Sequence, residues 1–214
     1  MSVPMRRAAP SVASVLQPLK AAVLFVLLAP LLAGCGFNTI PTYEEQAKAA
    51  WSEVLNQYQR RADLIPNLVE TVKGFAAQER EVLAAVVEAR AAATQVEVSA
   101  ETLTDPDAFA AFQARQAELG GALARLLAVV ENYPELKSSQ NFLALQAQIE
   151  GTENRIAVAR RDYIEAVRRY NTALRTLPSM LWARLWFTDN RPYQNFTIEE
   201  DKMDAPKVDF GSAG

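Results

Sequence analysis

Residues 139–177 read SQNFLALQAQIEGTENRIAVARRDYIEAVRRYNTALRTL, and Pro178 follows. Apolar or small side chains recur there every three or four residues, which is the period of one face of an α-helix. That face carries Phe142, Leu145, Ile149, Thr152, Ile156, Ala159, Tyr163, Ala166, Tyr170, Ala173 and Leu177. A helix of this length, about 55–60 Å, cannot bury its apolar face alone. Other helices must lie along it, and the heptad spacing favours shallow crossing angles.

Three further amphipathic segments precede this stretch. The first begins near Thr42, where Thr42 and Glu45 fit a capping box. Its apolar positions include Trp51, Leu55, Tyr58 and Ala62. Residues 63–66 are predicted to form a turn, because a proline suits the first turn of a new helix. The second segment follows, with apolar positions at Leu68, Val72, Phe75, Val82, Val86 and Ala89.

The third segment has the clearest start signal in the chain. Asp105, Pro106 and Asp107 supply a capping side chain, a proline and a first-turn acid. Its apolar positions are Phe109, Phe112, Gln116, Leu119, Leu123, Leu126, Val130 and Tyr133, and Pro134 ends it. Residues 94–104, which lack a firm pattern, are predicted to be a loop. The Gly120–Gly121 pair weakens the helix and predicts a bend or a close helix approach.

Four helical segments joined mostly by short connections predict an all-α fold. We expect an antiparallel up-down-up-down four-helix bundle over residues 42–178, with a long C-terminal helix and an irregular tail. Residues 179–214 are expected to hold an apolar patch and an extended tail. In the patch, Trp182, Leu185 and Trp186 share one helical face, which predicts packing beneath the bundle or a lipid interface. Residues 190–214, with two prolines and an acidic run at 199–201, are predicted to be extended or disordered.

The N-terminus predicts export and a lipid anchor. Arg6 and Arg7 are followed by an apolar run at 21–33, which is short for a membrane span. The sequence LAGC at 32–35 resembles the lipobox of bacterial lipoproteins, and Cys35 is the only cysteine. This predicts a signal peptide at 1–34, a lipidated Cys35 and a tether at 35–41. The expected location is the cell envelope, with the body outside the cytoplasm; Gly36 favours the outer membrane where the organism has one.

Composition narrows the range of functions. The chain of 214 residues has no histidine, a single cysteine and a formal net charge of −3. Residues 1–34 carry three positive charges and no negative one, so the remainder carries −6. This acidic balance argues against a nucleic-acid partner. The lack of histidine removes the commonest general base and the commonest transition-metal ligand, and we expect no cofactor and no metal.

Several blocks of sequence resemble the LemA family. They are RRADLIPNLVETVKG at 60–74, LLAVVENYPELK at 126–137 with Asn141 and Phe142 after it, ENRIA at 153–157 with its continuation to Asn171, and APKVDF at 205–210. The resemblance implies a helical bundle in the cell envelope, for a family with no established catalytic activity or cofactor. Its members usually keep an N-terminal transmembrane helix, whereas this chain resembles a lipoprotein there.

The predicted topology brings two polar motifs to one end of the bundle. With the tether at the base, the turn at 63–66 and the connection near Pro134 would meet at the membrane-distal tip. We interpret this tip either as helix caps and turns or as a docking surface for an unidentified envelope protein. Its residues are Arg60, Arg61, Asp63, Asn67, Asn132, Tyr133 and Lys137.

Two alternatives to a non-catalytic scaffold remain open from the sequence. Glu150 and Glu153 could serve a carboxylate-based, metal-dependent enzyme, although helical-bundle metal sites of this kind normally include histidine. A self-assembling envelope protein is the other alternative, because long amphipathic helices with residual apolar faces form homo-oligomers readily.

Overall fold

The structure, a computed structural model, describes residues 36–95 and 100–197, and within these ranges every regular element is a helix. The elements are α2 (Thr39–Lys73), α3 (Arg80–Thr94), the 3₁₀ helix η1 (Ala100–Leu103), α4 (Pro106–Val130), α5 (Pro134–Lys137), α6 (Gln140–Ala173) and α7 (Ser179–Leu185). The all-α prediction is confirmed. The long helix predicted from residue 139 is α6, with 34 residues.

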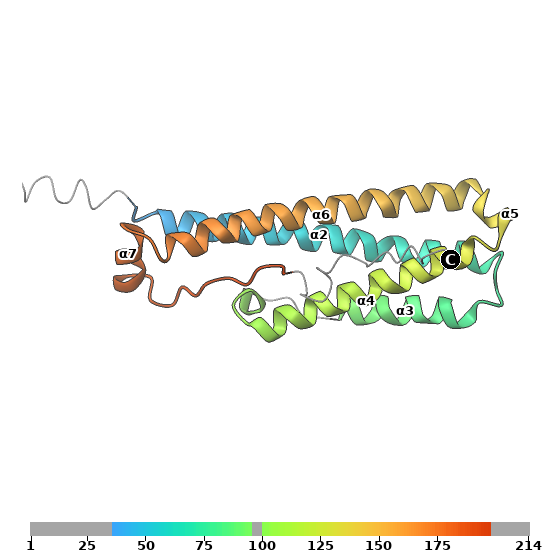
Figure 1. The fold of residues 1–214 in the computed structure, drawn as a ribbon, viewed down its shortest axis with the longest axis horizontal. Coiled ribbons are helices and arrows are strands. Elements are labelled where there is room, and N and C mark those ends of the chain that lie inside the picture. The colour runs from blue at the N-terminus through green and yellow to red at the C-terminus, as the bar shows by residue number, and fades with distance from the viewer. Residues whose placement is uncertain (1–35, 96–99, 198–214) are drawn as a thin grey trace, which may run out of the picture.

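The molecule is a rod built on one pair of long helices (Figure 1). Helices α2 and α6 run antiparallel and pack along their length. The shorter α3 and α4 pair with each other beside the C-terminal half of α2. The connections α2–α3 and α4–α6 lie at one end, called here the distal tip, and α7 lies at the opposite end, the base. Helices α4 and α6 are not among the closely packed pairs, so a closed four-helix bundle is not confirmed.

The predicted turn at residues 63–66 is wrong, because α2 continues through Pro66 to Lys73. A proline inside a helix lacks the N–H that would bond to the carbonyl four residues earlier, here that of Ala62. The Ala62 carbonyl instead accepts a hydrogen bond from Nε of Arg90 on α3, at 2.7 Å. The neighbouring helix therefore supplies the donor that the proline removed.

We expect Arg90→Ala to lower the free energy of unfolding by about 1–2 kcal/mol, because it leaves the Ala62 carbonyl without a partner in a packed interface. Chemical denaturation followed by circular dichroism measures this. Combining it with Pro66→Ala restores the backbone N–H, so the double variant should recover most of the loss. Equal losses in the single and double variants would contradict the assignment.

Other sequence expectations have mixed outcomes. Helix α2 begins at Thr39, before the capping box predicted at Thr42. The start of α4 is confirmed, since the Asp105 side chain accepts hydrogen bonds from the N–H groups of residues 107 and 108. A Cβ added to Gly120 or Gly121 would meet nothing within 4 Å, so this pair does not mark a close helix approach.

The core consists of two apolar clusters separated by a polar layer. The distal cluster joins the second half of α2 to α3, α4 and the start of α6. The basal cluster is rich in aromatic residues and joins the first half of α2 to the start of α4 and the second half of α6. The polar layer between the clusters consists of three buried polar side chains, one from each helix: Arg61 of α2, Gln116 of α4 and Thr152 of α6.

The residues after α7 form a strap that runs back along the rod (Figure 1). Tyr193 and Phe196 are buried in the basal cluster. Asn171 on α6 bonds to both the N–H and the carbonyl of Tyr193, each at 2.9 Å. The Gln194 N–H donates to the carbonyl of Leu103 at 2.7 Å. Residues 190–197 have no regular secondary structure, which agrees with the extended alternative of the prediction, and these contacts hold them against the rod. The rest of the predicted tail lies outside the described residues.

Candidate functional site

The polar residues predicted to share the distal tip occupy two separate places. Arg60, Arg61, Asp63 and Asn67 lie within α2, and Arg60 is about 20 Å of helix before the end of α2 at the tip. The remaining three, Asn132, Tyr133 and Lys137, lie in the α4–α6 connection. The shared cluster is therefore wrong, because it depended on a turn at Pro66.

The distal tip is held together by other partners. The Tyr133 hydroxyl donates to Oε1 of Glu79 at 2.7 Å and accepts from the Gln78 amide at 2.8 Å. The hydrogen bond to Glu79 is the main cause of a raised pKa at Tyr133. Lys137 pairs with Glu131 within its own connection. These contacts join the two connections at the tip and match the interpretation of the motif as turn stabilisation.

Arg61 is the centre of the buried polar layer. Its guanidinium donates from Nη1 to Oε1 of Glu153 on α6 at 2.8 Å. From Nη2 it donates to the side-chain oxygen of Gln116 on α4 at 2.7 Å and to the main-chain carbonyl of the same residue at 3.2 Å. The third donor, Nε, is buried without a partner among the described residues. One side chain of α2 therefore links the two helices that scarcely touch each other.

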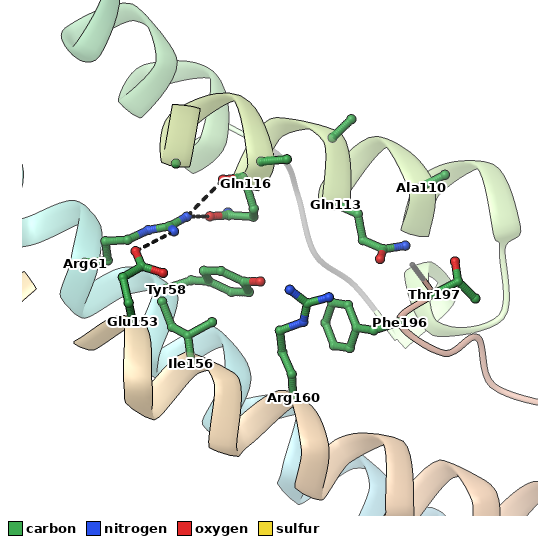
Figure 2. Close-up of a pocket in the computed structure, with 13 residues that line it drawn as sticks. Tyr58, Arg61, Ala110, Gln113, Gln116, Glu153, Ile156, Arg160, Phe196 and Thr197 are labelled. Carbon is green, nitrogen blue, oxygen red and sulfur yellow. Dashed lines mark hydrogen bonds and ion pairs between the residues drawn. The ribbon is translucent and has the colours of Figure 1, made fainter. Parts of the chain in front are cut away.

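A cleft of about 510 Å³ opens beside this layer, between α4 and α6, with α2 behind it and the strap at one end (Figure 2). Figure 2 shows the Tyr58 hydroxyl, the Arg160 guanidinium and the Gln113 amide directed into it. Burial raises the pKa of Tyr58, against the opposing positive charges of Arg160 and Arg61. The hydroxyl therefore stays protonated and can donate a hydrogen bond.

The carboxylates considered for a metal have other partners. Glu153 pairs with Arg61, and Oε1 of Glu150 accepts from the Gln146 amide at 2.9 Å. In the part of the chain that the structure describes, no three acidic, cysteine or histidine side chains group closely enough to hold a metal ion.

The base carries an exposed apolar surface, which we call the basal patch: Leu177, Leu181, Leu185 and Trp186. Leu185 and Trp186 are each more than two-thirds exposed, whereas the third predicted patch residue, Trp182, is half-buried against the basal cluster. Two exposed arginines, Arg175 and Arg184, lie in the same short segment.

The start of the described chain is fixed against this end of the rod. The Phe37 ring packs edge-on against Trp182 at 5.3 Å and Trp186 at 6.4 Å between ring centroids. Gly36 adopts φ of +115°, and an added Cβ would lie 3.0 Å from Cγ of Pro178. Cys35 itself lies outside the described residues, and Gly36, which follows it in sequence, lies against Pro178 next to the basal patch.

The sequence contains only weak indications that Arg160 and Glu153 lie at this cleft. Arg160 belongs to an Arg-Arg-Asp run that suits a solvated helix face, and Arg161 does pair with Asp162 at 3.2 Å. Arg160 instead points inward, over the Phe196 ring at 4.3 Å. The apolar steps at 149, 152 and 156 did indicate that Glu153 lies next to the buried face.

The fold and these surfaces define a class: an elongated helical protein with an apolar end and a cationic cleft along its side. A model of the LemA family matches residues 50–210. The chain belongs to the LemA family, as its sequence blocks indicated.

Proteins named for the magnetosome are among its relatives. Magnetosome proteins MamQ 1 and MamQ 2 of Paramagnetospirillum magneticum (strain AMB-1) are each 26% identical over 188 residues, which is 80% of this chain and 68% of theirs. Magnetosome protein MamQ of Magnetospirillum gryphiswaldense is 26% identical over 158 residues, or 66% of this chain and 58% of that protein. Among the described residues of the present chain, no helix is both long and apolar enough to span a bilayer.

Proposed function

We propose that this chain is a membrane-associated protein of the bacterial cell envelope, anchored through a lipid on Cys35, that acts as a scaffold through protein contacts and not through catalysis. The observation that carries this proposal is the position of Gly36 and Phe37 against the basal patch. A lipid on the preceding residue would emerge beside that apolar surface. Membership of the LemA family and similarity to magnetosome proteins support the envelope assignment.

The basal patch has the composition of a surface that rests on lipid. Tryptophan favours the boundary between hydrocarbon and headgroups, and arginine can keep its charge in water while its stem lies on apolar surface. Each large apolar side chain that lipid partly covers contributes about 1 kcal/mol to the free energy of membrane binding. The patch would thus orient the rod, with the distal tip pointing away from the bilayer and towards partner proteins.

Lipidation is tested directly by metabolic labelling with an alkyne-tagged palmitate analogue. We expect label in the full chain and none in Cys35→Ala, together with release of that variant from washed membranes. Labelling that survives Cys35→Ala would reject the anchor, and unchanged membrane retention without label would favour an uncleaved N-terminal segment.

The basal patch is tested without the lipid, in the chain from residue 35 onward with Cys35→Ala. Adding Leu181→Gln, Leu185→Gln and Trp186→Gln should weaken vesicle binding roughly 30- to 150-fold, since about 2–3 kcal/mol of apolar burial is lost. Cosedimentation with phosphatidylethanolamine/phosphatidylglycerol vesicles measures the effect.

Matched controls are available on the side of the rod. Val87 and Leu143 are exposed to similar extents, near one half, but lie away from the base. Val87→Gln with Leu143→Gln should leave vesicle binding unchanged. Equal losses in both variants would mean that binding depends on general surface apolarity and not on the basal patch.

A further inference from the structure

The cleft holds an arginine that the described chain leaves without a carboxylate. The ion pairs of neighbouring arginines on α6 are all on the outer surface, where Arg161 pairs with Asp162 and Arg168 with Glu165. Within the described residues, the Arg160 guanidinium has no acidic group within 4 Å and stacks on the Phe196 ring. An arginine stacked on an aromatic ring keeps the N–H groups at its edge for polar partners, and here part of that edge already faces the Tyr58 hydroxyl.

The charge of the cleft suits one negative group. Arg61 and Arg160 contribute two positive charges, and Glu153 contributes one negative charge that Arg61 already neutralises. Tyr58 and Gln113 add uncharged donors from the back and from the opposite wall (Figure 2). A single carboxylate would meet donors from three helices, and a bidentate arginine contact gives such a pair its geometry.

We propose that this cleft is a carboxylate-binding site centred on Arg160, and that its ligand is an acidic segment of a polypeptide. The inference rests on the proposed function as a scaffold and names the chemistry of the partner. A peptide fits better than an isolated small acid, because the cleft continues along the rod.

The continuation is a second hollow of about 530 Å³ between α4 and α6. It shares Gly120 and Glu153 with the first cleft and adds the apolar side chains Leu123, Leu127 and Ile149. The junction beside Gly120 is open space, since an added Cβ would meet nothing within 4 Å. The pair of hollows would therefore accept an acidic residue together with apolar side chains near it in the same segment.

The chain itself contains a sequence of this kind. Thr197 lines the cleft, and the acidic run at 199–201 begins two residues later. We assign the carboxylate to a partner protein, and occupation of the cleft by this chain's own acidic run is the competing outcome that the experiment must separate. A suitable probe is the blocked, fluorescein-labelled peptide IEEDKMD, which repeats residues 198–204, with IQQNKMN as the counterpart in which amides replace the four carboxylates.

Binding is measured by fluorescence anisotropy with the full-length chain in detergent micelles. We expect the acidic peptide to bind, and Arg160→Gln to weaken its affinity at least 10-fold. Arg160→Lys should recover only part of this loss, because lysine keeps the charge without the planar fork. Arg161→Gln removes the same charge one residue away and should change the affinity less than twofold.

A second pair of variants keeps the test valid if Arg160→Gln does not fold. Gly120→Leu fills the junction of the two hollows, whereas Gly121→Leu places the same side chain on the exposed side of α4. Both replace a helical glycine with a better helix former. We expect only Gly120→Leu to abolish peptide binding.

The source of the carboxylate is found by comparing peptide binding to the natural chain with binding to a neutralised chain. The neutralised chain carries Glu199→Gln, Glu200→Gln and Asp201→Asn. Binding to the natural chain assigns the cleft to an external segment. Binding that depends on Arg160 but appears only in the neutralised chain shows that the chain's own carboxylates fill the site, and it overturns the assignment to a partner. No binding to either chain, or binding unaffected by Arg160→Gln and Gly120→Leu, overturns the proposal.

Failure of this site would be distinct from failure of the proposed function. Lipid labelling and membrane retention of Arg160→Gln should match those of the natural chain. A chain that binds no acidic peptide but keeps its lipid and its vesicle binding would still be a membrane-anchored scaffold. If the natural chain takes up no lipid label but binds the peptide, the anchor is rejected and the cleft assignment stands.

Discussion

Replacing Trp51 by alanine is expected to lower the free energy of unfolding by about 4 kcal/mol. Trp51 is 5% exposed and lies at the centre of the basal cluster. Its ring centroid is 5.1 Å from that of Tyr163, 5.2 Å from Phe112 and 5.6 Å from Phe109. The substitution removes an aromatic side chain of α2 that packs against both α4 and α6, and the rigid neighbours cannot close the cavity.

The same substitution at Trp186 provides the control, because that side chain is 68% exposed at the base. Trp186→Ala should change stability in the absence of lipid by less than about 0.5 kcal/mol. Urea denaturation followed by circular dichroism measures both variants without depending on tryptophan emission. Equal effects at the two positions would contradict the central role of Trp51 in the basal cluster.

Trp51→Ala has a second expected consequence, in the strap. Phe196 packs on Trp51 with ring centroids 6.0 Å apart, and the strap is also held by the Tyr163 hydroxyl, which donates to the Gln194 carbonyl at 2.8 Å. Losing the tryptophan ring should speed proteolytic cleavage within residues 190–197 before global unfolding. The Phe196 ring also stacks on the Arg160 guanidinium, so one side chain contacts both the basal cluster and the cleft.

Helical periodicity was enough to predict the main elements, because apolar side chains at steps of three and four residues are a local property. It predicted α6, and the local signal at residues 105–107 predicted the start of α4, whose cap the structure confirms. The proline rule failed at Pro66, because the group that compensates for the missing N–H is Arg90, which belongs to another helix. A contact between residues 28 positions apart leaves no periodic signal in either segment.

That one error displaced the predicted site. A turn at Pro66 would bring Arg60, Arg61 and Asp63 to the distal tip, whereas the continuous α2 carries Arg61 into the core. The cleft was missed for a related reason. It exists because α4 and α6 do not pack closely, and the spacing of apolar residues does not show which pairs of helices touch. The strap was missed because its contacts are scattered hydrogen bonds and two aromatic side chains.

The buried ion pair leads to the second large expected effect. Glu153→Ala removes the carboxylate from a guanidinium that is only 4% exposed, while Glu153 itself is 45% exposed. Stranding a buried charge costs about 3–5 kcal/mol. We expect about 2–3 kcal/mol here, because the open cleft admits water to the vacated position. Glu150→Ala, one turn away on the exposed surface, should cost less than about 0.5 kcal/mol.

Removing both charges should cost much less stability than removing one. In Arg61→Met with Glu153→Leu, no ion is left buried, and apolar replacement of buried ion pairs is often neutral or stabilising. We expect this double variant to lie within about 1 kcal/mol of the natural chain, well above Glu153→Ala. Denaturation of the three variants under one set of conditions measures the difference. A double variant as unstable as Glu153→Ala would mean that the lost hydrogen bonds, and not the stranded charge, set the cost.

If the double variant is stable, the polar layer must contribute something other than stability. A charged residue between two apolar clusters allows only one alignment of α2 with α6, because any slip places the guanidinium among aromatic or aliphatic side chains. The apolar double variant would permit neighbouring registers. Cysteine pairs across α2 and α6 can test this, with one pair placed at the native register and another shifted by one heptad. We expect only the native pair to crosslink in the chain with the natural polar layer, and both pairs to crosslink in the apolar double variant.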